Sequence, residues 1–338
     1  MLTWREAAEA PQRVHAQATT LAPILEALVA RLKATPPRAV MTLARGSSDH
    51  AATFGRHLIE TRLGIATGSS EPSIRSVYGI APGLEGMACI AISQSGHSPD
   101  LVTSAAMARR GGALVIALVN DTDSPLAAEA DYVLDLGAGS ESAVAATKSF
   151  ICSLTALARL VAYWAGDMGL LARLEALPAA LADAFDLDFE QGISILRDAS
   201  RLYVIGRGPG LAVAQEAALK LKETCRVHAE AVSAAELLHG PIAIVDPGFP
   251  VLVFAQDDAS RPGLAHAVDA LLERGARVLQ VGGAPLGGTA HLPLPATEAS
   301  LQPIVAIQAF YRMVLGLAMA RGIDPDRPAG LQKVTRTT

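Results

Sequence analysis

Three charged residues in the second half of the chain have types and a spacing that suit proton transfer. Glu216, Lys220 and Glu223 lie at positions i, i+4 and i+7, so they share one face of a helix. A carboxylate beside an ammonium on a partly buried face can be tuned to take up and return a proton. Such spacing more often marks a solvated, salt-bridged face. The apolar Ala217 and Leu221 between them argue against a fully exposed helix.

A histidine follows in a stretch that reads Leu-Leu-His-Gly-Pro, where glycine and proline predict a turn. The imidazole of His239 could serve in acid–base chemistry. A single histidine is nevertheless more often structural than catalytic. Residue chemistry alone therefore leaves both His239 and the charged helix undecided.

Two stretches in the first half have the composition of phosphate-binding turns. One holds Gly46, Ser47 and Ser48, and the other, at 93–98, reads Ser-Gln-Ser-Gly-His-Ser. Glycine allows a tight turn with outward N–H groups, and a following helix N-terminus adds partial positive charge. One such turn would be explained by helix capping, but two in one half favour an anion site. Neither matches a nucleotide-binding pattern.

Strands alternating with helices must position these residues. Apolar strand-like runs are expected at 39–43, 87–92, 113–119, 202–205, 250–254 and 277–281. Each is associated with a helical pattern, which predicts βαβ units and an α/β fold of parallel sheets flanked by helices. Ligands bind beyond the carboxyl ends of the strands in such sheets, where both serine-rich turns fall.

The chain reads as two copies of one plan. Its 338 residues suit two domains, and the stretch Leu-Ala-Arg-Gly-Ser-Ser in the first half is echoed by Val-Ile-Gly-Arg-Gly-Pro-Gly in the second. We expect a first domain at 1–190 and a second at 191–338, with an acidic stretch at 183–190 between them.

Composition limits the partners and the location. The net charge of −5 and the lack of a basic cluster argue against nucleic acid as a partner. No signal peptide and no uninterrupted apolar run of membrane-spanning length stand out. Three scattered cysteines indicate core residues of a reducing compartment, not a disulfide set or a metal site. We expect a cytoplasmic protein without membrane contact, metal or cofactor.

Together these segments resemble the SIS (sugar isomerase) family over nearly the whole chain, most closely the isomerase half of glucosamine-6-phosphate synthase and stand-alone glucosamine-6-phosphate deaminases. Ala-Leu-Lys-Leu-Lys-Glu at 218–223 is identical to the family's segment, and Ser-Gln-Ser-Gly-His-Ser is similar to its Ser-Gln-Ser-Gly-Glu-Thr. The other segments that carry the resemblance are 4–11, 45–48, 141–150, 228–230, 236–241 and 331–335.

The resemblance implies two tandem flavodoxin-like (SIS) domains and a role for each site residue. Residues implied to bind a small-molecule sugar phosphate are Ser47, Ser48, Ser93, Gln94, Ser95, Ser98 and Val144. Glu223 would carry a proton between C1 and C2, in an environment set by Glu216 and Lys220. His239 would help to open the sugar ring from the neighbouring subunit, which implies a homodimer with shared active sites. Lys333 would form or assist an imine.

Departures from the family concern the substrate. Arg45, His97 and Ala146 stand where the family has cysteine, glutamate and serine. We see no glutaminase domain and expect no use of glutamine. The resulting prediction is an aldose–ketose isomerase and deaminase that converts glucosamine 6-phosphate to fructose 6-phosphate and ammonia. The alternatives are a non-catalytic sugar-phosphate-binding regulatory module, a fructosamine-phosphate deglycase, or an ammonia-dependent glucosamine-6-phosphate synthase.

Overall fold

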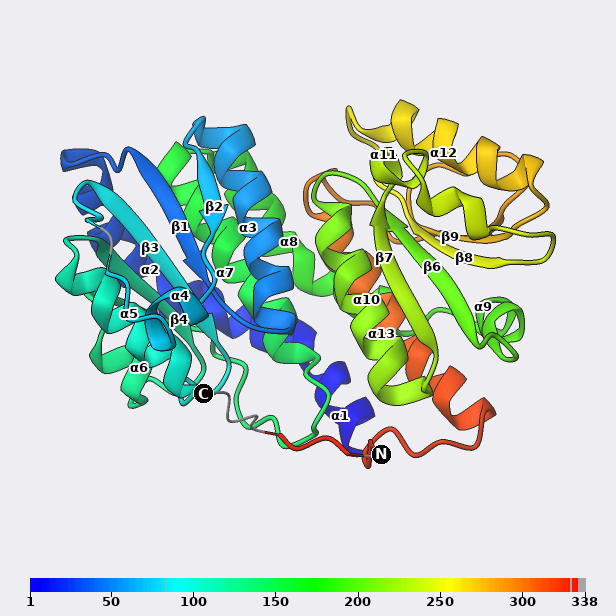
Figure 1. Cartoon of the computed structure of the whole chain (residues 1–338), viewed down its shortest axis with the longest axis horizontal. Helices are drawn as coiled ribbons and strands as arrows, with labels where there is room; N and C mark the ends of the chain where they lie inside the picture. Colours follow the sequence, from blue (N-terminus) through cyan, green and yellow to red (C-terminus); the bar gives the residue numbers. More distant parts are fainter. Residues whose placement is uncertain (82, 329, 334–338) are drawn as a thin grey trace. The chain divides into compact units, whose positions relative to one another are not determined.

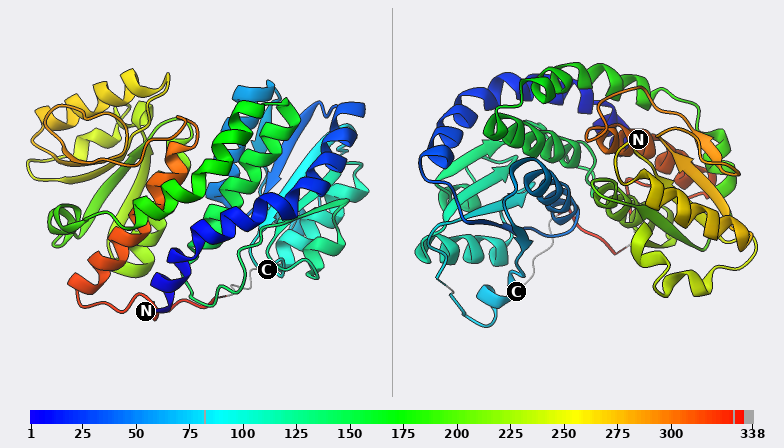
Figure 2. Two further views of the ribbon diagram at one scale, coloured as in Figure 1. Left: turned by 180° about the vertical axis from the view of Figure 1, so that it is seen from behind. Right: turned by 90° about the horizontal axis from the view of Figure 1, so that it is seen from above.

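The computed structural model describes residues 1–81, 83–328 and 330–333. They form two five-stranded sheets in which every neighbouring pair of strands is parallel, and helices flank each sheet (Figures 1 and 2). The expected α/β class with two parallel sheets is therefore confirmed.

The first sheet has the strand order β2-β1-β3-β4-β5. Its strands are β1 (Ala39–Leu43), β2 (Thr67–Ser69), β3 (Met87–Ser93), β4 (Leu114–Val119) and β5 (Tyr132–Asp135). One face packs on α5 (Pro99–Arg110) and α6 (Pro125–Ala128) through a core of small and branched apolar side chains. The other helices of this sheet are α2 (Ala10–Ala34), α3 (Ser47–Leu63), α4 (Ser73–Ser76) and α7 (Lys148–Ala165).

The second sheet repeats this order as β7-β6-β8-β9-β10. Its strands are β6 (Arg201–Gly206), β7 (His228–Ser233), β8 (Pro250–Phe254), β9 (Arg277–Val281) and β10 (Ala290–Leu292). A core of buried residues joins one face to α11 (Ala234–Leu237) and α12 (Arg261–Glu273). On the other face α10 (Gly210–Cys225) packs against α13 (Gln302–Ala320) (Figure 1). The remaining helices are α1 (Leu2–Ala8), α8 (Met168–Phe185), α9 (Glu190–Leu196) and a 3-10 helix (Pro241–Ile244).

Four strands were not expected from the sequence. These are β2, β5, β7 and β10, and each lies at the edge of its sheet. Edge strands of three or four residues, such as β2 and β10, are too short to produce a recognisable hydrophobic period. The longer β7 carries the charged Glu230 and is exposed along one side, so it lacks the continuous apolar run that marks the central strands.

The contacts within the chain divide it into two compact units, and each unit is made of segments that are not continuous in sequence. The first-sheet unit holds Ala10–Ser142, Lys148–Ala176 and, among the described residues after Leu331, Gln332 and Lys333. The second-sheet unit holds Met1–Glu9, Ala143–Thr147 and Leu177–Leu331. Residue 190 as the end of a sequence domain stays a prediction.

The N-terminal segment is anchored within the second-sheet unit. The backbone N–H groups of Leu2 and Thr3 donate to the Asp326 carboxylate at 2.6 and 2.8 Å. Trp4 packs edge-on against Phe185 at 5.5 Å between ring centroids. The two bonds to Asp326 join chain segments more than 300 residues apart in sequence.

One described helix, α13, is long and apolar enough to cross a membrane, but 78% of its most apolar stretch is buried inside the protein. Its composition is therefore that of a core helix. The three cysteines are free and buried, as expected for core residues. Burial raises the pKa of Cys89 to about 12 and that of Cys225 to about 11, so neither is an activated thiol.

Candidate functional site

Both serine-rich turns follow strands of the first sheet, at the carboxyl ends of those strands. Strands β1 and β3 are parallel neighbours, with Leu43 opposite Ala91, so their carboxyl ends lie side by side. Gly46, at φ +54°, is the N-cap residue that precedes α3. Gly96 has φ +67°, and a Cβ atom there would lie 2.1 Å from Ser124 Oγ. Only glycine fits that position, because both the conformation and the space exclude a side chain.

The hydroxyls of the second turn shape the turn itself. Ser93 Oγ accepts from the Gly96 N–H at 3.0 Å, and Ser95 Oγ accepts from the His97 N–H at 3.3 Å. These bonds use the oxygens as acceptors, so both O–H groups can still donate to an anion. The residues that this edge brings together are Ser47, Ser48, Ser93, Gln94, Ser95 and Ser98, all buried or half-buried.

Arg45 places a guanidinium beside these turns, and the sequence prediction gave it no role. Its Nε donates to Asp100 Oδ2 at 3.1 Å and its Nη1 to Glu71 Oε2 at 3.3 Å. Asp100 is buried in the first turn of α5, so Arg45 ties the end of β1 to the helix that follows the other turn. Its position next to Gly46 was visible in the sequence, but its two partners were not.

The charged helix is not a solvated face. Within α10, Glu216 is fully buried and the Lys220 side chain is 2% exposed, while Glu223 reaches the surface at 19%. Lys220 Nζ hydrogen-bonds the Glu223 carboxylate and lies 3.6 Å from Glu216 Oε1. The structure therefore brings all three together, with Glu216 and Lys220 out of water and Glu223 partly exposed at the surface.

His239 lies on a turn of the second-sheet unit that projects into solvent. The side chain is exposed, and the following Gly240 has φ +142°. The hydroxyl of Tyr203, at the core side, donates to the Pro241 carbonyl at 2.9 Å and fixes the turn. Leu238 and Ile244, which flank it in sequence, are exposed apolar residues at 38% and 50%.

Lys333 is held by an ion pair within the first-sheet unit. Its Nζ lies 3.4 Å from Oε2 of Glu141, whose side chain is fully buried. The same carboxylate accepts from the Ser149 hydroxyl at 2.5 Å and from the Ser149 N–H at 3.2 Å. Glu141 was known from the sequence only as part of a family segment, since its partner is 192 residues away.

Val144 belongs to a short segment that packs with the second-sheet unit. The N–H of its neighbour Ala143 donates to Glu6 Oε2 at 3.1 Å. Val144 and Ala146 are half-buried there. Glu6, in the N-terminal helix α1, therefore holds this segment in place.

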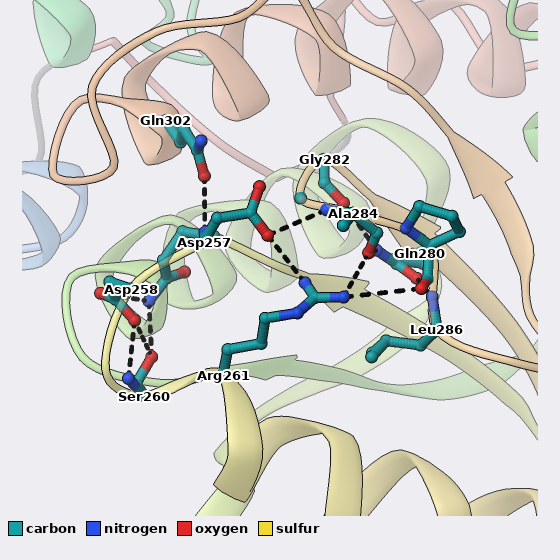
Figure 3. Close-up of polar contacts among 12 residues, drawn as sticks. Asp257, Asp258, Ser260, Arg261, Gln280, Gly282, Ala284, Leu286 and Gln302 are labelled. Atoms are coloured by element: carbon teal, nitrogen blue, oxygen red, sulfur yellow. Dashed lines mark hydrogen bonds and ion pairs between the residues drawn. The ribbon is translucent and has the colours of Figure 1, made fainter.

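The second sheet carries a counterpart of the 93–98 turn, after β8 (Figure 3). There Asp257 Oδ1 accepts from Arg261 Nη1 and from the Ala284 N–H, both at 2.9 Å. Asp258 accepts from the N–H and hydroxyl of Ser260. A cavity of ≈ 240 Å³ lies beside this loop, lined mainly by apolar and backbone groups. Two carboxylates here would repel a phosphate, whereas the turn at 93–98 contains no carboxylate.

No cluster of three or more potential metal ligands occurs among the residues that the structure describes.

Two parallel sheets with helices on both faces define the chain as an α/β protein of two similar units, one of which carries serine-rich turns at the carboxyl ends of its strands. Sequence comparison then identifies the family. The SIS domain family matches at residues 35–163 and 195–315, and the chain belongs to this family. It is 36% identical over 314 residues to the glutamine–fructose-6-phosphate aminotransferase (isomerizing) of Aeropyrum pernix, covering 87% of this chain and 50% of that protein. The chain spans about half the length of the curated relatives it matches.

Solved structures of similar proteins superimpose on this chain. A candidate phosphosugar isomerase from Silicibacter pomeroyi is 42% identical and superimposes with a TM-score of 0.90 over 96% of this chain and 99% of that one. The glucosamine-6-phosphate deaminase of Thermotoga maritima, 23% identical, matches over the full length of both chains with a TM-score of 0.78. At that identity the likeness concerns the fold alone.

Proposed function

We propose that the chain is a sugar-phosphate isomerase that deaminates glucosamine 6-phosphate to fructose 6-phosphate and ammonia. The observation that carries this proposal is the arrangement on α10, where the buried Glu216 and Lys220 support a partly exposed Glu223. A binding module would need the serine turns but not this buried charge set. Relatives named as isomerizing aminotransferases and phosphosugar isomerases support the same class.

Glu223 is the proposed carrier of the proton. In the open-chain sugar its carboxylate takes the proton from C2, which gives an enaminol across C1 and C2. Return of the proton to C1 produces an imine at C2, and water then releases ammonia and leaves the ketone. Glucosamine 6-phosphate and one water thus yield fructose 6-phosphate and ammonia. The serine hydroxyls at 93–98 and Ser48, with the helix N-termini of α3 and α5, are proposed to hold the phosphate.

Lys333 is proposed to assist at the imine stage. An amine attacks a C2 imine only after it has lost its own proton. The carboxylate of Glu141, 3.4 Å from Lys333 Nζ, is the adjacent acceptor for that proton. Exchange of the substrate nitrogen for the lysine nitrogen would release ammonia, and water would then free the ketose.

A homodimer with shared active sites is also proposed. The exposed His239, flanked by the exposed apolar Leu238 and Ile244, has the surroundings of a residue offered to a second copy of the chain. Mixing inactive His239→Ala subunits with inactive Glu223→Ala subunits should restore part of the activity. Full subunit exchange without any recovery would argue against a shared site. A cytoplasmic location remains a prediction.

The function is tested by ammonia release across a panel of sugar phosphates. Glucosamine 6-phosphate should give fructose 6-phosphate and ammonia in equal amounts. Turnover of fructosamine phosphates alone would favour the deglycase, and synthesis from fructose 6-phosphate and ammonia without the reverse reaction would favour the synthase. Saturable binding of sugar phosphates with no turnover would replace the enzyme by the regulatory module.

A further inference from the structure

Four side chains form a polar ladder between α10 and α13. The Tyr311 hydroxyl donates to Glu216 Oε1 at 3.1 Å. The same oxygen lies 3.6 Å from Lys220 Nζ, and Lys220 hydrogen-bonds the carboxylate of Glu223. Tyr311 and Glu216 are fully buried, and exposure begins only at Glu223. The ladder therefore runs from the core of the second-sheet unit to its surface.

Within this ladder one ammonium stands between two carboxylates. Charge attraction is strong where water is excluded, so the hydrogen bonding of Glu216 influences which carboxylate Lys220 approaches. Tyr311 donates to the very oxygen of Glu216 that faces Lys220. That bond satisfies part of the hydrogen-bonding capacity of the Glu216 carboxylate. The Lys220 ammonium therefore stays within hydrogen-bonding distance of the Glu223 carboxylate.

Packing alone does not account for the hydroxyl of Tyr311. The preceding residue, Phe310, fills its place in the same helix without a polar atom, and it contacts Phe254 edge-on at 5.8 Å between ring centroids. A buried phenol without a partner would be unfavourable, whereas a phenylalanine would fill nearly the same space. The hydroxyl therefore serves as a hydrogen-bond donor, and the Glu216 carboxylate accepts its hydrogen bond.

We propose that Tyr311 is a positioning residue for proton transfer by Glu223. Its hydroxyl holds Glu216, which keeps the Lys220 ammonium against the Glu223 carboxylate and so holds that carboxylate in place. Tyr311 acts through two other residues and does not touch the substrate. This inference rests on the proposed isomerase function and adds to it a residue that belongs to none of the sequence segments from which the resemblance was inferred.

The test measures ammonia release by Tyr311→Phe from glucosamine 6-phosphate with hydrogen or deuterium at C2. Loss of a hydrogen bond to a charged group should lower kcat about tenfold and leave KM nearly unchanged. The primary isotope effect should rise, because proton transfer becomes more rate-limiting. The control is Thr224→Val, which removes another buried hydroxyl of α10, one that donates to the Lys220 carbonyl at 2.7 Å. It should leave the isotope effect unchanged.

Two results would overturn the inference. One is a Tyr311→Phe enzyme with the kcat and isotope effect of the wild type. The other is a fall in kcat with an unchanged isotope effect, matched by Thr224→Val, because that pattern indicates less folded enzyme and no change in proton transfer. A wild-type protein that turns over no sugar phosphate would refute the proposed function and remove this inference with it.

Discussion

The buried pair of Glu216 and Lys220 makes a quantitative prediction about stability. Lys220→Met keeps most of the length of the side chain but removes the ammonium, which lies 3.6 Å from Glu216 Oε1. Breaking a buried ion pair by removing one partner typically costs about 3–5 kcal/mol, because the other charge stays buried. We expect the lower end, about 3 kcal/mol, since the Tyr311 hydroxyl still donates to Glu216.

Denaturant unfolding at neutral pH measures this cost. The matched control is Lys222→Met, two residues along the same helix and exposed, for which we expect a change within about 0.5 kcal/mol. The double substitution Glu216→Gln/Lys220→Met removes the stranded carboxylate and should regain most of the loss. If Lys220→Met costs no more than Lys222→Met, the pair is not buried in solution and does not hold the carboxylate of Glu223 in place.

Three further predictions concern the serine-rich edge and the N-terminal anchor. Replacing Ser93 and Ser95 together by Ala should raise KM for phosphorylated substrates with little change in kcat, which steady-state kinetics would show; unchanged kinetics would remove the phosphate role. Gly96→Ala should weaken sugar-phosphate binding measured by calorimetry, because φ is +67° and Ser124 Oγ would lie 2.1 Å from the new Cβ; normal affinity would show that the turn is not rigid. Burial opposes ionisation of Asp326, but hydrogen bonds from Thr3 and the backbone outweigh it and lower its pKa below the ordinary 3.8. Its contribution to stability is therefore complete above that value and lost as the pH falls through the lowered pKa, so Asp326→Asn should destabilise the protein at pH 7 and differ less from the wild type in acid. An equal difference in thermal unfolding at both pH values would contradict this.

The central strands and both serine turns were predictable because their signals are local. Buried parallel strands such as β3 and β4 are continuous apolar runs. Glycine and serine mark the turns after β1 and β3 in the sequence. The α10 charges were predictable as a set from their helical spacing. Their burial was not, since Glu216 and Lys220 are covered by helix α13, which lies far along the chain.

The contacts that were missed are the long-range ones. Tyr311 meets Glu216 across 95 residues, and Lys333 meets Glu141 across 192. No local pattern marks either pair, because the partners are set by how helices and segments pack. The sequence showed Arg45 only as a residue that stands where the family has cysteine. Its contact with Asp100 depends on the pairing of β1 with β3, which brings the segments after these two strands together. The roles of Tyr311, Glu216, Lys333 and Glu141 in catalysis stay predictions.

The most direct test of the account is the rate of ammonia release from glucosamine 6-phosphate by Glu223→Gln. The amide keeps the shape of the side chain but cannot take a proton at neutral pH. Loss of a general base typically costs roughly 10²–10⁴-fold in rate, so kcat should fall by that factor while substrate binding stays normal and Lys222→Gln stays near wild type. A folded Glu223→Gln enzyme that releases ammonia at a near-normal rate would contradict the account.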